Sequence, residues 1–378
     1  MVQVKYGLMS CDSHAQLGRD AFTSRMSAGR WGNLIPQVVE VEEAGEKVHR
    51  WLLNGQVLAG SVVNCPALMH DRRYYPKRWE EVPSMAYVPA ERLKALDEDH
   101  VDAEVLFPNT PVQVGTFPVG DAELELACVQ AYNDAMAEYA QTSERYIPLA
   151  LIPYLSPIEV VTAEVERAVR AGHRGILMVA APEKVKGSKP VTDRFWDPLW
   201  ATCQELGAPI NWHASSGVGI GLPRWKGYDE REAHTASTGH NYMGPCQVLP
   251  ALLFTGVFDR YPRLNWVLAE TGAGWLPHLL ERCDHEWERL HLWTEGIATR
   301  PSDVFRRQLY VDFWFERSGM ELRHAIGVDR IMWESDLPHI TTTYPESWAY
   351  VERSVEGLPQ EDREKLLFRN LMRVYHLN

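Results

Sequence analysis

Cysteine is scarce in this sequence, and its distribution excludes two classes of protein. The six cysteines in 378 residues lie too far apart for a disulfide scaffold, and none forms a C-x-x-C pair of the kind that holds zinc. Long apolar runs are lacking as well, since no stretch approaches the roughly 20 residues that cross a bilayer and the first residues lack the apolar core of a signal peptide. We therefore expect reduced, mostly buried thiols in a cytoplasmic protein that has no membrane as partner.

Positive charge is the second shortage. Lysine and arginine number 38 against 51 aspartates and glutamates, which leaves a net charge of -13. A surface of this sign repels a phosphate backbone, so we expect no nucleic acid as partner. Glycine (26) and proline (24) are not abundant and apolar residues make up 45% of the chain, which excludes disordered and low-complexity proteins. The composition predicts a folded chain that buries a full core.

Short apolar runs alternate with longer amphipathic stretches from about residue 100 onward, as is typical of repeated βαβ units. Helices are expected over 121–142, 157–171, 197–206, 246–258, 275–292, 320–326 and 360–375. Eight strands are expected, over 6–11, 103–107, 148–152, 175–179, 210–212, 265–269, 309–313 and 330–333. Eight strands separated by helices predict an α/β fold, a single (β/α)8 TIM barrel that spans residues 1–378.

The segment from Leu17 to Ala90 interrupts this alternation. It is rich in Trp, Tyr and Pro, and within it the alternating stretch 38–60 has turn signals at 43–45 and at Asn54-Gly55. We interpret residues 17–90 as an insertion after the first strand that contains a β-hairpin. Because such an insertion follows the carboxyl end of a barrel strand, we expect it to cap the pocket and to select the substrate.

The carboxyl ends of the predicted strands are rich in side chains that bind metals, and in a parallel barrel these ends carry the chemistry. Asp12 and His14 follow the first strand and lie two residues apart, so both face the same side. His213 ends the fifth strand, and Asp336 follows the eighth. Two imidazoles and two carboxylates suit Zn2+ and also accept Mn2+ or Fe2+. We expect these four residues to hold one divalent metal ion, zinc before manganese or iron.

Other residues near the strand ends are candidates for proton transfer and for substrate binding. Glu270 ends the apolar strand 265–269, and His240 lies in the long segment after the fifth strand. Together with Asp336, these two are our candidate catalytic residues. The candidate substrate contacts are Arg224, Asn109, Trp314 and His339, among which the arginine offers a fork of donors that fits a carboxylate.

Five motifs spread over nearly the whole chain are specific in combination. They are CDSH at 11–14, the stretch 93–108, WHASSG at 212–217, the stretch 257–289 and WESDLPH at 333–339. Through them the sequence resembles the amidohydrolase-related family (amidohydrolase 2) that contains aminocarboxymuconate semialdehyde decarboxylase and γ-resorcylate decarboxylase. The resemblance implies a metal-dependent barrel whose ligands fall on the four residues given above, and it implies a homodimer.

The sequence departs from the family pattern at two positions. Many members have H-x-H where this chain has Asp12-Ser13-His14, and the decarboxylases usually have a histidine where this chain has Glu270. The strand-four lysine that bridges two metals in binuclear relatives has no counterpart, because Lys184 and Lys186 fall in an expected loop. We therefore expect one metal ion.

The expected function is hydrolysis of a C–C, amide or ester bond in a small aromatic or unsaturated carbonyl compound, through a metal-activated water. Glu270 in the place of the histidine favours this reaction. The alternative, which the resemblance favours, is non-oxidative decarboxylation of an aromatic or unsaturated carboxylic acid. A non-catalytic binding protein and an unrelated fold are the other hypotheses, and the presence of all four expected ligands argues against the former.

Overall fold

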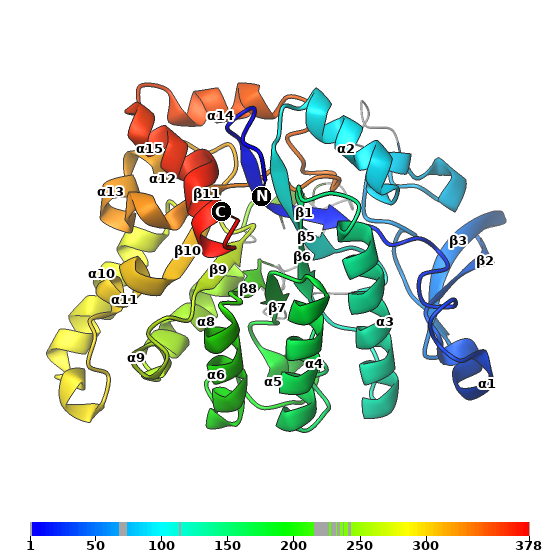
Figure 1. The fold of residues 1–378 in the computed structure, drawn as a ribbon, viewed down its shortest axis with the longest axis horizontal. Coiled ribbons are helices and arrows are strands. Elements are labelled where there is room, and N and C mark those ends of the chain that lie inside the picture. Colours follow the sequence, from blue (N-terminus) through cyan, green and yellow to red (C-terminus); the bar gives the residue numbers. More distant parts are fainter. Residues whose placement is uncertain are drawn as a thin grey trace.

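Eight parallel strands form a nearly closed barrel, as the sequence predicts (Figure 1). The computed structural model describes residues 2–67, 74–112, 115–214, 227, 232, 235–236, 238–240 and 243–377. In sheet order the strands are β1 (Met9–Ala15), β5 (Ala103–Pro108), β6 (Tyr146–Ala150), β7 (Gly175–Leu177), β8 (Ile210–His213), β9 (Trp266–Ala269), β10 (Leu309–Phe313) and β11 (Ile331–Trp333). Each is paired in parallel with the next, so all eight carboxyl ends meet at one mouth.

The helices surround the barrel, except for α1, which lies at the edge of the molecule (Figure 1). They are α1 (Ala28–Trp31), α2 (Pro89–Glu98), α3 (Ala122–Ala140), α4 (Ile158–Ala171), α5 (Pro182–Val185), α6 (Asp197–Leu206), α8 (Met243–Leu253), α9 (Val257–Arg260), α10 (Leu276–Arg289), α11 (Pro301–Gln308), α12 (Ser318–Glu321), α13 (Arg323–Ile326), α14 (Ser347–Val355), α15 (Gln360–Glu364) and α16 (Asn370–Val374), with a π-helical turn over Lys365–Arg369. Both α4 and α6 end at a glycine in the left-handed region, Gly172 and Gly207, which lets the chain turn back into the sheet. Within the described residues no helix combines the length and apolarity needed to cross a bilayer.

Large aromatic side chains fill the layer between the sheet and helix α6. Trp196 packs against Trp200, and Trp200 packs against Trp266 of β9. The ring of Trp266 also contacts that of Trp212 from β8 edge to face, with centroids 4.9 Å apart. All four are fully buried. These tryptophans are therefore core residues, and five of the six cysteines are likewise buried free thiols.

Strand β1 is longer than the sequence pattern predicts. The expected strand ended at Cys11, whereas β1 continues to Ala15 and pairs with β5 as far as Pro108. All seven of its residues are buried, so the polar side chains of Asp12 and His14 belong to a core strand and do not follow it. The register shifts between Ser10 and Ser13, and such a bulge is a common device for aiming a side chain.

The barrel closes where β1 meets the chain that follows β11. The amide of His14 donates to the carbonyl oxygen of Leu337 at 2.6 Å, and the amide of Asp336 donates to that of Asp12 at 3.0 Å. These two bonds join the beginning of the sheet to its end. We call this junction the seam.

Three serine hydroxyl groups lie together beside the seam. The oxygens of Ser10, Ser13 and Ser335 are 3.1 to 3.2 Å from one another, and all three residues are buried. Ser10 Oγ donates to the carbonyl oxygen of Asp12 at 2.7 Å, so the trio is tied to the backbone of β1.

A buried arginine crosses the seam from outside. The guanidinium of Arg92, from α2, binds both carboxylate oxygens of Glu104 on β5, at 2.8 and 2.7 Å. It also donates to the carbonyl oxygens of His14 and Leu337, at 3.2 and 2.8 Å. Both charged side chains are completely shielded from solvent. Arg92 therefore ties three segments of the barrel together at the point of closure.

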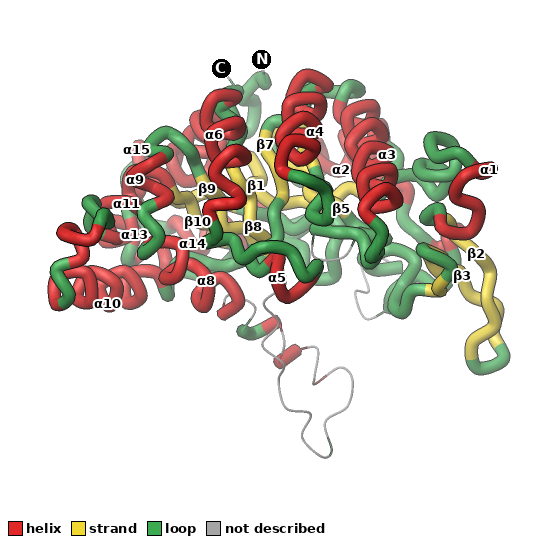
Figure 2. Tube along the Cα trace, turned by 90° about the horizontal axis from the view of Figure 1, so that it is seen from below, coloured by secondary structure: helices red, strands yellow, loops and turns green. Residues whose placement is uncertain are grey.

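The insertion after β1 contains the predicted hairpin. Strands β2 (Gln37–Glu43), β3 (Glu46–Leu53) and β4 (Gln56–Val57) form an antiparallel sheet, with positive φ at Ala44, Gly45, Asn54 and Gly55, as two-residue hairpin turns of type I′ require. This sheet lies at the edge of the molecule (Figures 1 and 2), while the chain that follows it reaches the barrel mouth at Asn64. The indole of Trp51 fixes that chain by donating to the carbonyl oxygen of Val62 at 2.8 Å.

Replacing Arg92 by methionine will leave Glu104 as an unpaired charge in the core. Breaking a buried pair on one side costs about 3 to 5 kcal/mol, so we expect a lower free energy of unfolding, measured by chemical denaturation. Arg30→Ala is the matched control, because the Arg30–Glu123 pair is exposed and its loss costs at most about 1 kcal/mol. Equal stabilities of the two variants would show that Arg92 does not hold the barrel closed.

Candidate metal centre

The structure brings the four expected ligands together at the barrel mouth. Asp12 and His14 lie in the second half of β1, His213 is the last residue of β8, and Asp336 lies just beyond β11. The Nε2 atom of His14 lies 3.3 Å from that of His213, 3.3 Å from Asp336 Oδ1 and 3.5 Å from Asp12 Oδ1. His213 Nε2 is 3.4 Å from Asp12 Oδ2. All four side chains are buried, and their ligand atoms fall into two groups that share His14: one has Asp12 and His213, the other Asp336 and His339.

Both imidazoles are held in the neutral form that a metal ligand needs. Burial lowers the pKa of His14 to about 4, helped by the nearby His339, and it lowers the pKa of His213 well below its usual range. His14 Nδ1 lies 2.8 Å from the carbonyl oxygen of Pro108, where it donates, so the lone pair of His14 is on Nε2. The ligand nitrogen thus faces the cluster.

The carboxylate of Asp12 provides the test of whether a cation fits. Both of its oxygens are buried, and neither has a hydrogen-bond donor among the described residues. Burial raises the pKa of Asp12 well above its usual range, and the carboxylates of Asp336 and Glu270 raise it further. A buried carboxylate without donors stays ionised only beside a positive partner. The residues present therefore fit a divalent cation.

Asp336 is held in an unusual backbone conformation by several contacts. Its φ is +56°, in the left-handed region that residues other than glycine seldom adopt. His339 Nδ1 lies 2.8 Å from Asp336 Oδ1, and the hydroxyl of Thr341 donates to Oδ2. Burial alone would raise the pKa of Asp336, but the imidazoles of His339 and His14 outweigh it and hold the pKa below its usual range. The ring of His339 stacks on that of His14 with centroids 3.6 Å apart, which fixes the orientation of His339.

Glu270 reaches the same cluster from β9. Its Oε2 atom lies 3.3 Å from His213 Nε2, and its φ of +57° is the second left-handed non-glycine conformation at the mouth. The carboxylate of Asp312 on β10 holds this turn by accepting three consecutive amides, those of Glu270, Thr271 and Gly272, the last two at 3.0 Å. Glu334 accepts the Glu270 amide as well, at 3.0 Å. The orientation of Glu270 thus depends on the buried carboxylates of Asp312 and Glu334.

A small cavity of about 140 Å³ opens beside the cluster. His14, His213 and His339 line one part of it, and Phe107 and Leu177 are apolar residues of its wall. Asn64 and Asn109 close it where the insertion meets the barrel: the amide of Asn64 donates to Asn109 Oδ1 at 3.0 Å, and Asn109 Nδ2 donates to the Asn64 carbonyl at 3.1 Å. Asn109 and His339, two expected substrate contacts, therefore line a cavity next to the expected metal ligands.

The remaining candidates lie elsewhere. Trp314 lines a different cavity together with Glu270. His240 Nδ1 lies 2.8 Å from the carbonyl oxygen of Ala236, and no contact joins it to the cluster within the described part of the chain. Arg224 lies outside the described residues.

Three residues that support the site were not singled out from the sequence. Asp312 and Glu334 are fully buried, and burial raises the pKa of each. The sequence did carry a signal for Asp312, which is a charged residue inside the apolar strand LYVDF. Thr341 carries no such signal, because a threonine in a loop is ordinary.

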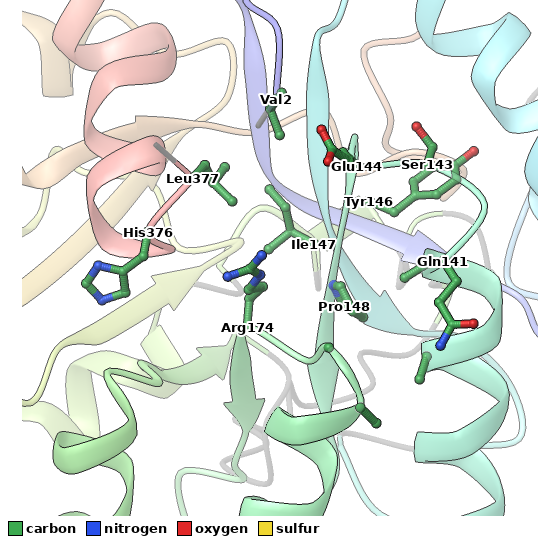
Figure 3. A pocket seen from close by; sticks show the side chains of 14 residues that line it. Val2, Gln141, Ser143, Glu144, Tyr146, Ile147, Pro148, Arg174, His376 and Leu377 are labelled. Carbon is green, nitrogen blue, oxygen red and sulfur yellow. The ribbon is translucent and has the colours of Figure 1, made fainter.

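A further cavity, of about 260 Å³, lies at the opposite end of the barrel (Figure 3). Val2 and Leu377, next to the two chain termini, line it together with the start of β6 and with Arg174, which precedes β7. Figure 2 also shows both termini at this end. Barrel enzymes carry out chemistry at the carboxyl ends of their strands, so this cavity is not part of the candidate site.

Comparisons with known proteins agree with this picture. The model of the amidohydrolase family (Amidohydro_2) matches residues 47–377. A γ-resorcylate decarboxylase from Rhizobium sp. (strain MTP-10005) is 26% identical over 316 residues, covering 76% of this chain and 86% of that protein. A 2-amino-3-carboxymuconate-6-semialdehyde decarboxylase from Dictyostelium discoideum is 27% identical over 226 residues, covering 55% of this chain and 54% of that protein. The family resemblance inferred from the motifs is confirmed.

Solved structures share the fold at lower identity. An amidohydrolase from Mycobacterium avium subsp. paratuberculosis K-10 has a TM-score of 0.74 at 19% identity and covers 99% of this chain and 100% of its own. A dihydroxybenzoic acid decarboxylase from Polaromonas sp. JS666, solved with bound manganese and the inhibitor 2-nitroresorcinol, has a TM-score of 0.65 at 19% identity and covers 98% of this chain and 97% of its own. Both extend the barrel likeness over nearly the whole chain.

Metal content tests the cluster directly. We expect about one equivalent of divalent metal per purified chain, as for a single four-ligand site, and its loss in His213→Ala, measured by plasma mass spectrometry. His324→Ala is the control, since that side chain is 68% exposed and far from any ligand in the sequence. Wild-type protein that stays free of metal after reconstitution would remove the assignment.

Asparagine in place of Asp312 keeps the size of the side chain but replaces one acceptor oxygen by an amide that cannot accept. The turn at Glu270 then loses an acceptor, and leaving a buried donor unsatisfied costs about 1 to 3 kcal/mol. We expect a lower unfolding temperature for Asp312→Asn and no change for Asp303→Asn, whose side chain is 61% exposed. Identical melting curves for the two variants would show that the turn does not need Asp312.

Proposed function

Because this chain belongs to the amidohydrolase family, we propose that it is a metal-dependent enzyme that removes CO2 from a small aromatic carboxylic acid without oxidation. The observation that carries the proposal is the buried group of two imidazoles and two carboxylates at the carboxyl ends of the strands. The names of the relatives add the reaction, since both curated relatives described above are decarboxylases. The homodimer implied by the resemblance remains a prediction.

Asp12, His14, His213 and Asp336 would hold the metal ion. A divalent ion bound there acts as a Lewis acid that neutralises and orients an acidic oxygen of the substrate. Two carboxylates and two imidazoles accept Mn2+ as well as Zn2+, and the manganese bound to the Polaromonas decarboxylase supports testing both.

Decarboxylation replaces the bond between a ring carbon and the carboxylate by a C–H bond, so the protein must deliver one proton to that carbon. We assign this delivery to His339, which lines the small cavity and whose Nδ1 lies 2.8 Å from the Asp336 carboxylate that orients it. The stacking of His339 on His14 keeps the pair in place. Phe107 and Leu177 reduce the access of water to the ring carbon.

Glu270 has a second role in this proposal. Its Oε2 lies 3.3 Å from His213 Nε2, the atom that faces the other ligand atoms, so the carboxylate stands beside the cluster and within reach of a substrate bound there. It occupies the place where, by the family pattern, decarboxylases usually have a histidine. We assign to Glu270 the exchange of a proton with a hydroxyl or carboxyl group of the substrate.

Hydrolysis, the function that the sequence favoured through Glu270, is the less supported reaction. The comparisons support decarboxylation better, because the curated relatives are named for it. The site itself serves either reaction, since the same ligands and proton donors are used in both. The choice therefore rests on the relatives and on direct assay.

Release of CO2 from 2,6-dihydroxybenzoate tests the proposal. We expect the wild-type protein, loaded with manganese or zinc, to release CO2, and Glu270→Gln to do so about 100- to 10,000-fold more slowly, the usual effect of losing a proton-transfer group. Glu270→Gln should keep its metal, which separates loss of proton transfer from loss of the ion. Glu295→Gln, a change in the short helix over Leu292–Glu295, is the matched control and should have wild-type activity. Hydrolysis of a phenyl ester by the wild type, with no CO2 from any aromatic acid offered, would overturn the proposal in favour of hydrolysis.

A further inference from the structure

A second and larger cavity adjoins the metal centre. Its volume is about 490 Å³, within the range of pockets that hold whole small molecules. It is built from the chain segments that follow β9, β10 and β11, all at the carboxyl mouth, together with Thr238 and Gly239 from the segment after β8. The small cavity beside His14 and the larger one share no described lining residue. The centre is therefore open on two sides.

The inner end of the large cavity consists of residues that contact the metal ligands. Glu270 lines it, and Glu270 Oε2 lies 3.3 Å from His213 Nε2. Thr341 lines it as well, and its hydroxyl donates to Asp336. A substrate held at the centre can therefore extend into this cavity without leaving the ligands.

The walls of the large cavity are aromatic. Trp314 and Phe315 lie in the loop after β10 with their rings stacked, centroids 5.6 Å apart and planes inclined by 29°. Phe315 is 57% exposed, a large apolar side chain left open beside a functional site. Trp275 faces them from the β9 loop, and its indole N–H is already bonded to the carbonyl oxygens of Thr271 and Gly272. These walls offer ring surface to a ligand.

Hydrogen bonds to Glu316 fix the walls in position. Glu316 Oε2 accepts the amides of Trp314 and Phe315 at 2.8 and 3.2 Å, and Oε1 accepts the amide of Ala273 at 3.2 Å. One carboxylate thus ties the β9 loop to the β10 loop. The shape of the cavity is therefore set by defined contacts between these loops.

The charge of the described lining residues disfavours an acidic ligand group. The described lining residues include two glutamates, Glu270 and Glu316, and among them there is no lysine, arginine or histidine. A second carboxylate placed here would lose its hydration and face like charges. An uncharged apolar group would instead bury surface against the three aromatic rings.

We propose that the large cavity is a substituent pocket, and that the substrate is an aromatic monoacid with an uncharged alkyl or aryl substituent that lies against Trp314 and Phe315. This inference rests on the proposed function, because it takes the acidic end of the substrate to be at the metal centre. It extends that function by naming the class of acid: larger than a bare dihydroxybenzoate and without a second acidic group.

The experiment compares four acids: 2,6-dihydroxybenzoate, its 3-pentyl and 4-pentyl derivatives, and its 4-carboxy derivative. We expect kcat/KM for CO2 release to be at least about tenfold higher for one of the pentyl acids than for the parent, since the alkyl chain leaves water. The carboxy derivative should fall below the parent. Equal values for pentyl and parent acids, or a preference for the carboxy derivative, would overturn the inference while leaving the decarboxylase function intact.

A matched pair of variants tests the location of the substituent. Phe315→Ala should lower the ratio of kcat/KM for the preferred pentyl acid to that for the parent by about tenfold. Trp293→Ala removes an aromatic ring that is also exposed, at 43%, but does not line the cavity, and should leave the ratio unchanged. An equal effect of both variants, or none from Phe315→Ala, would place the substituent elsewhere.

Binding without turnover separates this inference from the proposed function. Calorimetric titration of the metal-loaded protein with resorcinol and with 4-pentylresorcinol and 5-pentylresorcinol requires no release of CO2. Tighter binding of a pentyl compound, lost in Phe315→Ala, would support the pocket even if none of the acids reacts. Equal affinities for resorcinol and both pentyl compounds would overturn it.

Discussion

The closure of the barrel between its first and last strands is the constraint on which the site depends. Asp12 and His14 lie on one side of the seam and Asp336 on the other, so the ligands meet only if the barrel closes in this register. The backbone bonds from His14 to Leu337 and from Asp336 to Asp12 involve the same residues that carry the proposed ligand atoms. Arg92 then fixes the closure by binding the carbonyl oxygens of His14 and Leu337. The geometry of the site therefore depends on the closure of the barrel. A shift of one residue in the seam would turn the ligands away from one another.

Several features of the mouth are energetically unfavourable. It holds a carboxylate without donors at Asp12, two imidazoles kept neutral by burial, and two left-handed residues at Glu270 and Asp336. Each costs stability, and each persists because surrounding groups determine it: Asp312 and Glu334 at the Glu270 turn, and the seam at Asp336. A cation that binds the folded form alone would offset part of this cost and would couple metal binding to stability.

The sequence predicted the barrel and the members of the cluster because both follow from local patterns. Apolar strands alternate with helices over most of the chain, and ligand types at strand ends must meet at one mouth. What the sequence could not provide depends on contacts between distant segments. The extension of β1 through His14 needs β5 as its partner as far as Pro108, and Arg92 looks like an ordinary helical arginine until Glu104 is placed beside it. For the same reason the hairpin could be predicted from its turns, whereas its position at the edge of the molecule could not.

The charges at the mouth bear on the choice between the two reactions. With Asp12, Asp336 and Glu270 ionised and both ligand imidazoles neutral, a divalent cation leaves the centre with a net negative charge. An aromatic carboxylate would add another, in a site of low dielectric constant where like charges repel strongly. Binding such an acid is therefore favoured when a proton enters with it, and His339, 2.8 Å from Asp336, is placed to carry one. Decarboxylation consumes one proton for each CO2 released, whereas hydrolysis of an ester or amide does not require an acidic substrate. The acidic residues of this mouth, including the glutamate in the family's histidine position, are thus compatible with decarboxylation. The condition is that the proton that enters with the substrate is the one transferred to the ring carbon.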